Sequence, residues 1–214
     1  MSILITGGTG GIGVGLTYEL VNRGEEVVLF DIAPRPEPLT EIKNKVTIVP
    51  GDLKVWSEVL NVVKDYNVKG IFHHGSMLSI PSELNPWAAF QVSVVGTMHV
   101  LEAARLFGVE KVLFASSDAT YGLGTTGVVT DETIQRPVTI YGANKLYGEL
   151  LGRFYRRKFG LDFRCIRYPM VLRPGIKIRA LPTYIPWMIE YAATGKPFEC
   201  WVTEDVKAPF VYYK

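Results

Sequence analysis

This 214-residue sequence contains little cysteine and no long apolar run, and its positive and negative charges nearly balance. Only Cys165 and Cys200 occur, without CxxC spacing, so a disulfide scaffold is not predicted and a reducing, cytoplasmic compartment is expected. The first apolar run, residues 2–6, is too short for a secretory signal, and no later run is long enough to span a bilayer. With 23 basic and 21 acidic residues, the chain is too balanced to favour a nucleic-acid or membrane partner.

The sequence does contain a repeated alternation of short β-branched runs with longer segments of helical period. The runs predict strands at residues 2–6, 26–31, 45–52, 70–76, 111–117 and 162–169. Helices are predicted at about 13–23, 55–66, 86–107 and 141–159, and loops at 34–40 and 122–139. Continuous apolar strands joined by helices indicate the α/β class, with a doubly wound parallel sheet covered on both faces.

A glycine-rich loop, TGGTGGIG at residues 6–13, follows the first predicted strand and opens the first predicted helix. Gly7, Gly10 and Gly13 are spaced so that backbone amides and the positive end of the helix dipole can face one pyrophosphate. Glycine also removes the β-carbon that would block close approach. The loop therefore predicts a dinucleotide site of the Rossmann type, with Gly11 and Ile12 among its contacts.

An acidic residue, Asp31, ends the second predicted strand 18 residues after Gly13. At about this interval a carboxylate reaches the adenosine ribose hydroxyls and repels a 2′-phosphate, so NAD is expected as the cofactor. Arg35, shortly afterwards, leaves NADP as the alternative. Asp52 and Leu53 follow the third strand, where Asp52 can accept from the adenine amino group and Leu53 can pack on the ring.

The second chemical feature is the pair Tyr141 and Lys145, which are four residues apart and so lie on one face of the predicted helix. A phenol with a pKa of about 10 is a poor base near neutrality, but a neighbouring ammonium lowers that pKa. Tyr141 can then exchange a proton with a secondary alcohol while hydride moves to or from a nicotinamide. Ser117 ends the fifth strand, at the sheet edge where ligands bind, and is predicted to orient the substrate oxygen; Ser116 is the alternative.

Taken in order, TGGTGGIG, VVLFD, GDL, FASSDATYG and YGANK resemble the motifs of the extended short-chain dehydrogenase/reductase family, the NAD-dependent epimerase/dehydratase group. The resemblance covers the whole chain. It implies a tightly held NAD, a triad of Ser117, Tyr141 and Lys145, and a bond from Lys145 to the nicotinamide ribose. The further cofactor contacts that we expect are His74, Ser76 and Tyr168.

This resemblance also divides the chain into an NAD-binding Rossmann domain, residues 1–170, and the start of a substrate-binding region, residues 171–214, which is expected to be incomplete. UDP-sugar 4-epimerases look similar, but they carry an asparagine where this chain has Met170. L-threonine 3-dehydrogenases look similar too, which implies a small substrate touching Ser79. Their glycine- and threonine-rich substrate segment is replaced here by PGIKIRALPTY, residues 174–184.

The function expected is that of an NAD-dependent oxidoreductase or epimerase, which moves a hydride between NAD and a secondary alcohol of a sugar, nucleotide sugar or small hydroxy compound. An L-threonine 3-dehydrogenase-like enzyme and a catalytically silent NAD-binding domain are the alternatives. Family members imply a homodimer through helices 86–107 and 141–159. Ser93 stands where many members have an asparagine, which predicts a local rearrangement. No metal is expected, because the neighbours His73 and His74 point to opposite faces of a strand.

Overall fold

The computed structural model of the protein describes residues 2–173 and 183–212. The chain divides into two compact units, Met1–Arg167 and Tyr168–Lys214. The sequence places the end of the NAD-binding domain at residue 170, close to this division. Most of the segment PGIKIRALPTY, residues 174–182, lies outside the described residues.

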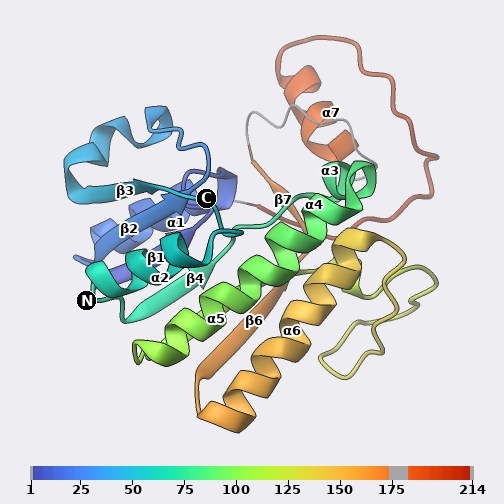
Figure 1. Ribbon diagram of the computed structural model, residues 1–214. Coiled ribbons are helices and arrows are strands. Elements are labelled where there is room, and N and C mark those ends of the chain that lie inside the picture. The colour runs from blue at the N-terminus through green and yellow to red at the C-terminus, as the bar shows by residue number, and fades with distance from the viewer. Residues whose placement is uncertain (1, 174–182, 213–214) are drawn as a thin grey trace. The chain divides into compact units, whose positions relative to one another are not determined.

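The first unit is built on a sheet of six strands (Figure 1). They are β1 (Ser2–Thr6), β2 (Glu26–Asp31), β3 (Val46–Pro50), β4 (Gly70–His73), β5 (Lys111–Ser117) and β6 (Asp162–Tyr168). Their order across the sheet is β3-β2-β1-β4-β5-β6, and the pairs β1–β2, β1–β4, β2–β3 and β4–β5 are parallel. This order is that of the Rossmann fold, in which ligands bind where the order reverses, between β1 and β4. The predicted fold class is therefore confirmed.

This unit contains the four predicted helices together with short helical segments that the sequence did not predict. In chain order, all of these segments are α1 (Gly11–Asn22), η1 (Glu37–Lys45), α2 (Trp56–Asp65), α3 (Ser79–Leu84), α4 (Pro86–Phe90), η2 (Gln91–Val95), α5 (Gly96–Leu106), η3 (Asp118–Thr120) and α6 (Ile140–Phe159). The helix predicted at 86–107 is interrupted by the π-helical turn η2. The loop predicted at 34–40 is wrong from Glu37 onward, because a 3₁₀-helix begins there; Pro38 stands in its first turn, where no backbone donor is needed.

Both faces of the sheet are buried, as the apolar strands predict. Along β1, Leu4 belongs to the core on one face, whereas Ile3 and Ile5 belong to the core on the other. The Leu4 side is covered by α2, α5 and α6, and the Ile3 side by α1 and η1. Helices α5 and α6 lie next to each other in front of the sheet (Figure 1). Successive strand side chains alternate between two dry interiors, so polar chemistry is left to the strand ends.

The second unit contains the helix α7 (Tyr184–Ala193) and the parallel strand pair β7 (Met170–Leu172) and β8 (Phe210–Tyr212). A group of aromatic rings holds α7 to the segment after it: Trp187 lies edge-on to Trp201, and Phe198 lies between Trp201 and Tyr191. Among the helices of the described residues, none combines the length and apolarity needed to cross a membrane.

Candidate functional site

The glycine loop forms a cradle at the end of β1. Gly7 has a φ of +66°, in the left-handed region, and its N–H donates to the carbonyl oxygen of Phe30 at 2.8 Å. A β-carbon on Gly13 would lie 2.5 Å from the carbonyl oxygen of Gly8, so the loop can fold back on α1 only if residue 13 is glycine. Helix α1 begins after Gly10 without a side-chain cap and without an acidic residue in its first turn. Its first amides and its positive dipole end are therefore available to a phosphate.

Asp31, at the end of β2, holds this loop in place. Its Oδ2 accepts from the backbone N–H of Thr9 at 3.1 Å and from the Thr9 hydroxyl at 2.8 Å, while Oδ1 accepts from the N–H of Ala33 at 3.3 Å. Thr9 was not singled out from the sequence. The only signal was its position between the glycine pairs of TGGTGGIG. Asp31 thus stabilises the conformation of the glycine loop through hydrogen bonds to it.

Beyond β4, a directed chain of hydrogen bonds passes through His73. Gly75 N–H donates to the Thr6 hydroxyl oxygen (3.0 Å), and Thr97 donates its only hydroxyl proton to the Ser93 carbonyl (2.6 Å). His73 Nε2 lies 3.0 Å from the Thr97 oxygen and must therefore donate to it, so Nδ1 accepts from Thr6 at 2.6 Å. His73 is consequently neutral and held in a single tautomer.

Ser93 lies in the π-helical turn η2. The Ser93 hydroxyl accepts from the backbone N–H of Met77 at 3.2 Å and so ties η2 to the segment after β4. That segment lies against the glycine loop, since a β-carbon on Gly7 would meet Gly75 at 3.0 Å. The neighbouring His74 stacks on Phe72 and turns away from the His73 chain.

Burial governs the two histidines electrostatically. Burial, with a smaller contribution from the charge of Lys145, lowers the pKa of His73 to about 3. Burial also lowers the pKa of His74 to about 4, again with a contribution from Lys145. The end of β4 therefore lies within electrostatic reach of the catalytic lysine predicted from the sequence.

The remaining predicted contacts have distinct surroundings. Asp52 closes the turn before α2, with Oδ1 accepting from Lys54 N–H at 2.9 Å and Oδ2 paired with Lys54 Nζ at 3.2 Å. Leu53 is buried against Gly75. Ser76 is half-buried in the segment after β4, and Ser79 is exposed at the first residue of α3. Tyr168 and Met170 belong to the second unit.

Helix α6 and strand β5 bring the predicted triad together. Lys145 is buried, and its Nζ donates to the carbonyl oxygen of Ala115 at 2.6 Å. The same Nζ lies 5.6 Å from the centre of the Tyr141 ring and 5.1 Å from that of Phe114. Burial lowers the pKa of Lys145 to about 7, so the side chain is close to half-charged at neutral pH.

The pKa of Tyr141 is shifted in the direction opposite to the one expected from the sequence. Burial raises the pKa of its phenol; the hydrogen bond with Ser117 opposes this rise, and the charge of Asp118 adds to it. Lys145, whose Nζ lies over the ring at 5.6 Å from its centre, is not among the causes of this shift. The Ser117 hydroxyl also donates to Asp118 Oδ1 at 3.0 Å, so it has one proton to share between that carboxylate and the phenol oxygen.

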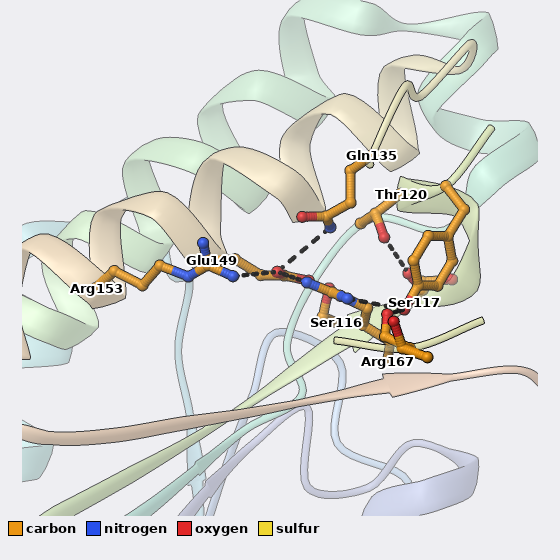
Figure 2. A network of polar contacts seen from close by, with 9 residues as sticks. Ser116, Ser117, Thr120, Gln135, Glu149, Arg153 and Arg167 are labelled. Carbon is orange, nitrogen blue, oxygen red and sulfur yellow. Dashed lines mark hydrogen bonds and ion pairs between the residues drawn. The ribbon is translucent and has the colours of Figure 1, made fainter. Parts of the chain in front are cut away.

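Ser116, the alternative to Ser117, turns to a different partner. Its hydroxyl donates to Glu149 Oε1 at 2.5 Å, in a buried network that Arg167 completes (Figure 2). The structure thus directs Ser117, and not Ser116, to Tyr141. Sequence reasoning missed Glu149 and Arg167; the available signal was that Glu149 follows Lys145 by one further helical turn.

Comparison with known proteins now decides the family. The family model described as the NAD dependent epimerase/dehydratase family matches residues 3–214. The chain belongs to this family. The family assignment confirms the resemblance read from the motifs, and its NAD dependence confirms the cofactor expected from the glycine loop and Asp31.

The relatives include L-threonine dehydrogenases and UDP-glucose 4-epimerases. Bovine mitochondrial L-threonine 3-dehydrogenase is 31% identical over 216 residues, which cover 98% of this chain and 56% of the bovine protein. The holo L-threonine dehydrogenase of Cupriavidus necator superposes with a TM-score of 0.90 at 28% identity, over 99% of this chain and 68% of that one. The NAD complex of Thermus thermophilus UDP-glucose 4-epimerase gives 0.87 at 27% identity, over 99% and 70%. The chain spans about half the length of the curated relatives it matches.

Proposed function

We propose that this chain carries the cofactor site and proton relay of an NAD-dependent oxidoreductase or epimerase acting on a secondary alcohol. The observation that carries the proposal is the meeting of Ser117, Tyr141 and Lys145 where β5 ends and α6 begins. The glycine loop follows β1 in the same parallel sheet. Since the carboxyl ends of parallel strands share one edge, the relay and the dinucleotide cradle face the same crevice.

The residues present fit NAD. The uncapped start of α1 and the loop of Gly7, Gly10, Gly11, Ile12 and Gly13 would hold the pyrophosphate. Three of these positions need glycine, because β-carbons on Gly7, Gly10 and Gly13 would crowd the backbone that shapes the cradle. Asp31 would accept from the ribose hydroxyls with the lone pairs that Thr9 and Ala33 leave over. The remaining cofactor contacts proposed are Asp52 and Leu53 for the adenine, Lys145 for the nicotinamide ribose, and His74, Ser76 and Tyr168. When bound, NAD supplies the hydride acceptor.

The proton chemistry falls to Tyr141. With its pKa raised by burial, the phenol keeps its proton and is ready to donate to a carbonyl oxygen held by Ser117. Removing a proton from an alcohol requires the phenolate, which a protonated Lys145 favours. Because the pKa of Lys145 is about 7, mild changes in its surroundings switch it between the two forms. The same three side chains can thus serve oxidation and reduction.

Calorimetry with NAD⁺, followed by absorbance of NADH with L-threonine and with UDP-glucose as probes, tests this proposal. We expect NAD⁺ to bind and Tyr141→Phe to leave that binding in place while abolishing turnover. A dehydrogenase accumulates NADH, whereas an epimerase converts UDP-glucose without net NADH. Failure to bind NAD⁺ would refute the proposal; binding without turnover of either probe would favour the silent NAD-binding domain.

An L-threonine 3-dehydrogenase-like activity is the second candidate. It is favoured by the threonine dehydrogenases of cattle and pig, 31% and 32% identical over 98% of this chain. Ser79, exposed at the start of α3, is the residue proposed to touch a small substrate. If so, Ser79→Ala should raise KM for L-threonine more than it lowers kcat, whereas turnover unaffected by this change would remove Ser79 from the site.

We also propose a homodimer through α4, α5 and α6. These neighbouring helices leave several large apolar side chains exposed: Trp87, Phe90, Met98, Leu106, Tyr147, Leu150, Phe154 and Phe159. An apolar surface of this kind favours a protein partner. Sedimentation of Leu150→Glu should show a monomer. The control Leu123→Glu, on an exposed loop residue, should sediment as the wild type does.

A cytoplasmic location is proposed from the cysteines. Cys165 and Cys200 are both free thiols, as a reducing compartment allows. The bovine relative is named as mitochondrial, so cell fractionation has to compare the cytoplasm with other compartments. Recovery in any compartment other than the cytoplasm would refute this assignment.

A further inference from the structure

A buried carboxylate, Glu149, lies in the middle of α6. Its Oε1 accepts a hydrogen bond from the Ser116 hydroxyl. Arg167 donates to both carboxylate oxygens, from Nε to Oε1 at 2.9 Å and from Nη2 to Oε2 at 2.8 Å. Burial raises the pKa of Glu149, but the bonds from Arg167 and Ser116 outweigh it and hold the pKa below its usual value. Glu149 is therefore an ionised group at a place where an unpaired charge would be costly.

Glu149 continues a row of contacts between α6 and β5. Tyr141, Lys145 and Glu149 stand four residues apart, on successive turns of the helix. Each is tied to one of three consecutive residues at the end of β5. Lys145 binds the carbonyl oxygen of Ala115, Glu149 binds the hydroxyl of Ser116, and Tyr141 binds that of Ser117.

Because side chains alternate along a strand, Ser116 and Ser117 leave β5 in opposite directions. A bond that fixes Ser116 therefore also fixes the peptide from which Ser117 projects. The Ser116 bond to Glu149 is short and buried, and its acceptor is immobilised by the two-point grip of Arg167. The direction of the Ser117 hydroxyl toward Tyr141 is thus set from the opposite side of the strand.

The same ion pair anchors the loop that follows β5. Arg167 Nη1 donates to the Tyr121 hydroxyl at 2.7 Å and its guanidinium lies 5.0 Å from the centre of the Tyr121 ring. Gln135 donates to Glu149 Oε2 at 3.4 Å (Figure 2). Arg136 N–H donates to the Tyr121 carbonyl at 3.3 Å and closes the base of the loop. One end of the loop is therefore fastened to Arg167 and the other to Glu149, the two members of one ion pair.

We propose that Glu149, paired with Arg167, is a positioning residue that aligns Ser117 with Tyr141 through Ser116 and fastens the base of the loop between Tyr121 and Arg136. The inference rests on the proposed function, since it assigns Glu149 a role in the alignment of the relay. Two substitutions separate alignment from general stability. Ser116→Ala removes one hydroxyl and keeps the ion pair, and Glu149→Gln removes the charge and keeps the shape.

Labelling the tyrosines with ¹³C at Cζ lets NMR follow the phenol of Tyr141 directly. The chain has 11 tyrosines, and the signal lost in Tyr141→Phe identifies the relevant one. In Ser116→Ala and in Glu149→Gln we expect the Tyr141 signal to shift and its titration midpoint to move upward, because the bond from Ser117 that opposes the effect of burial is weakened. With a turned-over probe, kcat should fall about tenfold or more while KM changes little.

Arg153→Gln is the matched control, because Arg153 reaches the same carboxylate at 3.9 Å from an exposed position. It should leave the Tyr141 signal unchanged. An unchanged Tyr141 signal in folded Ser116→Ala would overturn the proposal, and this variant decides alone if Glu149→Gln does not fold. A failure of the proposed function would instead appear as a wild type that neither binds NAD⁺ nor turns over a probe, and the NMR comparison requires neither.

Discussion

Replacing Lys145 with methionine tests whether burial sets the charge of the central residue of the relay. In the native chain the Lys145 ammonium is buried between α6 and β5, and burial lowers its pKa from 10.5 to about 7. Methionine has a similar length and no charge. The variant therefore removes the titration of this group while keeping most of its apolar stem.

The expected change in stability follows from the linkage between unfolding and the protonation of Lys145. Between about pH 7 and 10.5 the unfolded chain carries a proton on Lys145 that the native chain has released, so unfolding takes up a proton and stability rises with pH. As the pH falls through this window the advantage is lost, until both states are charged below about pH 7. At about 1.4 kcal/mol per pKa unit the whole window amounts to about 5 kcal/mol, of which about 2 kcal/mol falls between pH 7 and pH 9.

Urea unfolding followed by circular dichroism at pH 7 and pH 9 measures this difference. The free energy of unfolding of the wild type, taken relative to Lys145→Met, should rise by about 2 kcal/mol between the two pH values. Other titrating groups cancel in the comparison. The exposed Lys64→Met variant serves as the control and should show no such trend. If the wild type and Lys145→Met keep the same difference at both pH values, burial does not set the charge of Lys145.

Three further outcomes are expected. Gly13→Ala would place a β-carbon 2.5 Å from the Gly8 carbonyl oxygen, so calorimetry should show NAD⁺ affinity reduced roughly tenfold; unaltered affinity would exclude this loop from the cofactor site. Gly148→Ala would bring a β-carbon to 2.5 Å from the Phe114 ring, and thermal unfolding should show a loss of about 1–3 kcal/mol, which an unchanged Tm would contradict. Folding lowers the pKa of His73 from 6.5 to about 3, so only the unfolded chain takes up this proton as the pH drops below 6.5. Between pH 7 and pH 5 the free energy of unfolding of the wild type should therefore fall by about 2 kcal/mol relative to that of His73→Gln, as measured by urea unfolding.

The fold could be predicted because its signals are local and repeated. Strand β1 reads as an uninterrupted apolar run, and the structure explains why: Leu4 and its neighbours Ile3 and Ile5 enter two different cores. The glycine loop could be predicted because a β-carbon at Gly13 would clash with the backbone of the loop, so the spacing of the glycines is visible in the sequence. Ser117, Tyr141 and Lys145 could be brought together from strand direction and helical period alone, although their catalytic roles stay predictions.

What the sequence did not reveal depends on burial and on contacts between distant segments. Glu149 has the appearance of an ordinary charged helix residue, and only the burial of its carboxylate beside Arg167 distinguishes it. Thr9 gained its role from Asp31, 22 residues away in the chain. The direction of the Tyr141 pKa was mistaken because spacing along a helix shows that Lys145 is near, but not that the phenol is buried deeply enough for its pKa to rise.

The hydrogen-bond chain through His73 fixes how the central elements align along their length. Each hydrogen bond in it runs in one direction, and its members come from three elements: Thr6 belongs to β1, His73 to β4 and Thr97 to α5. The apolar neighbours of these residues would tolerate a shifted pairing of β1 with β4, since one buried aliphatic contact resembles another. A shift by one residue would turn the imidazole to the opposite face and leave both threonine hydroxyls buried without it. The imidazole thus selects one alignment of β1 with β4 among several that apolar packing alone would allow. That alignment also determines which residues of the glycine loop lie opposite the segment after β4.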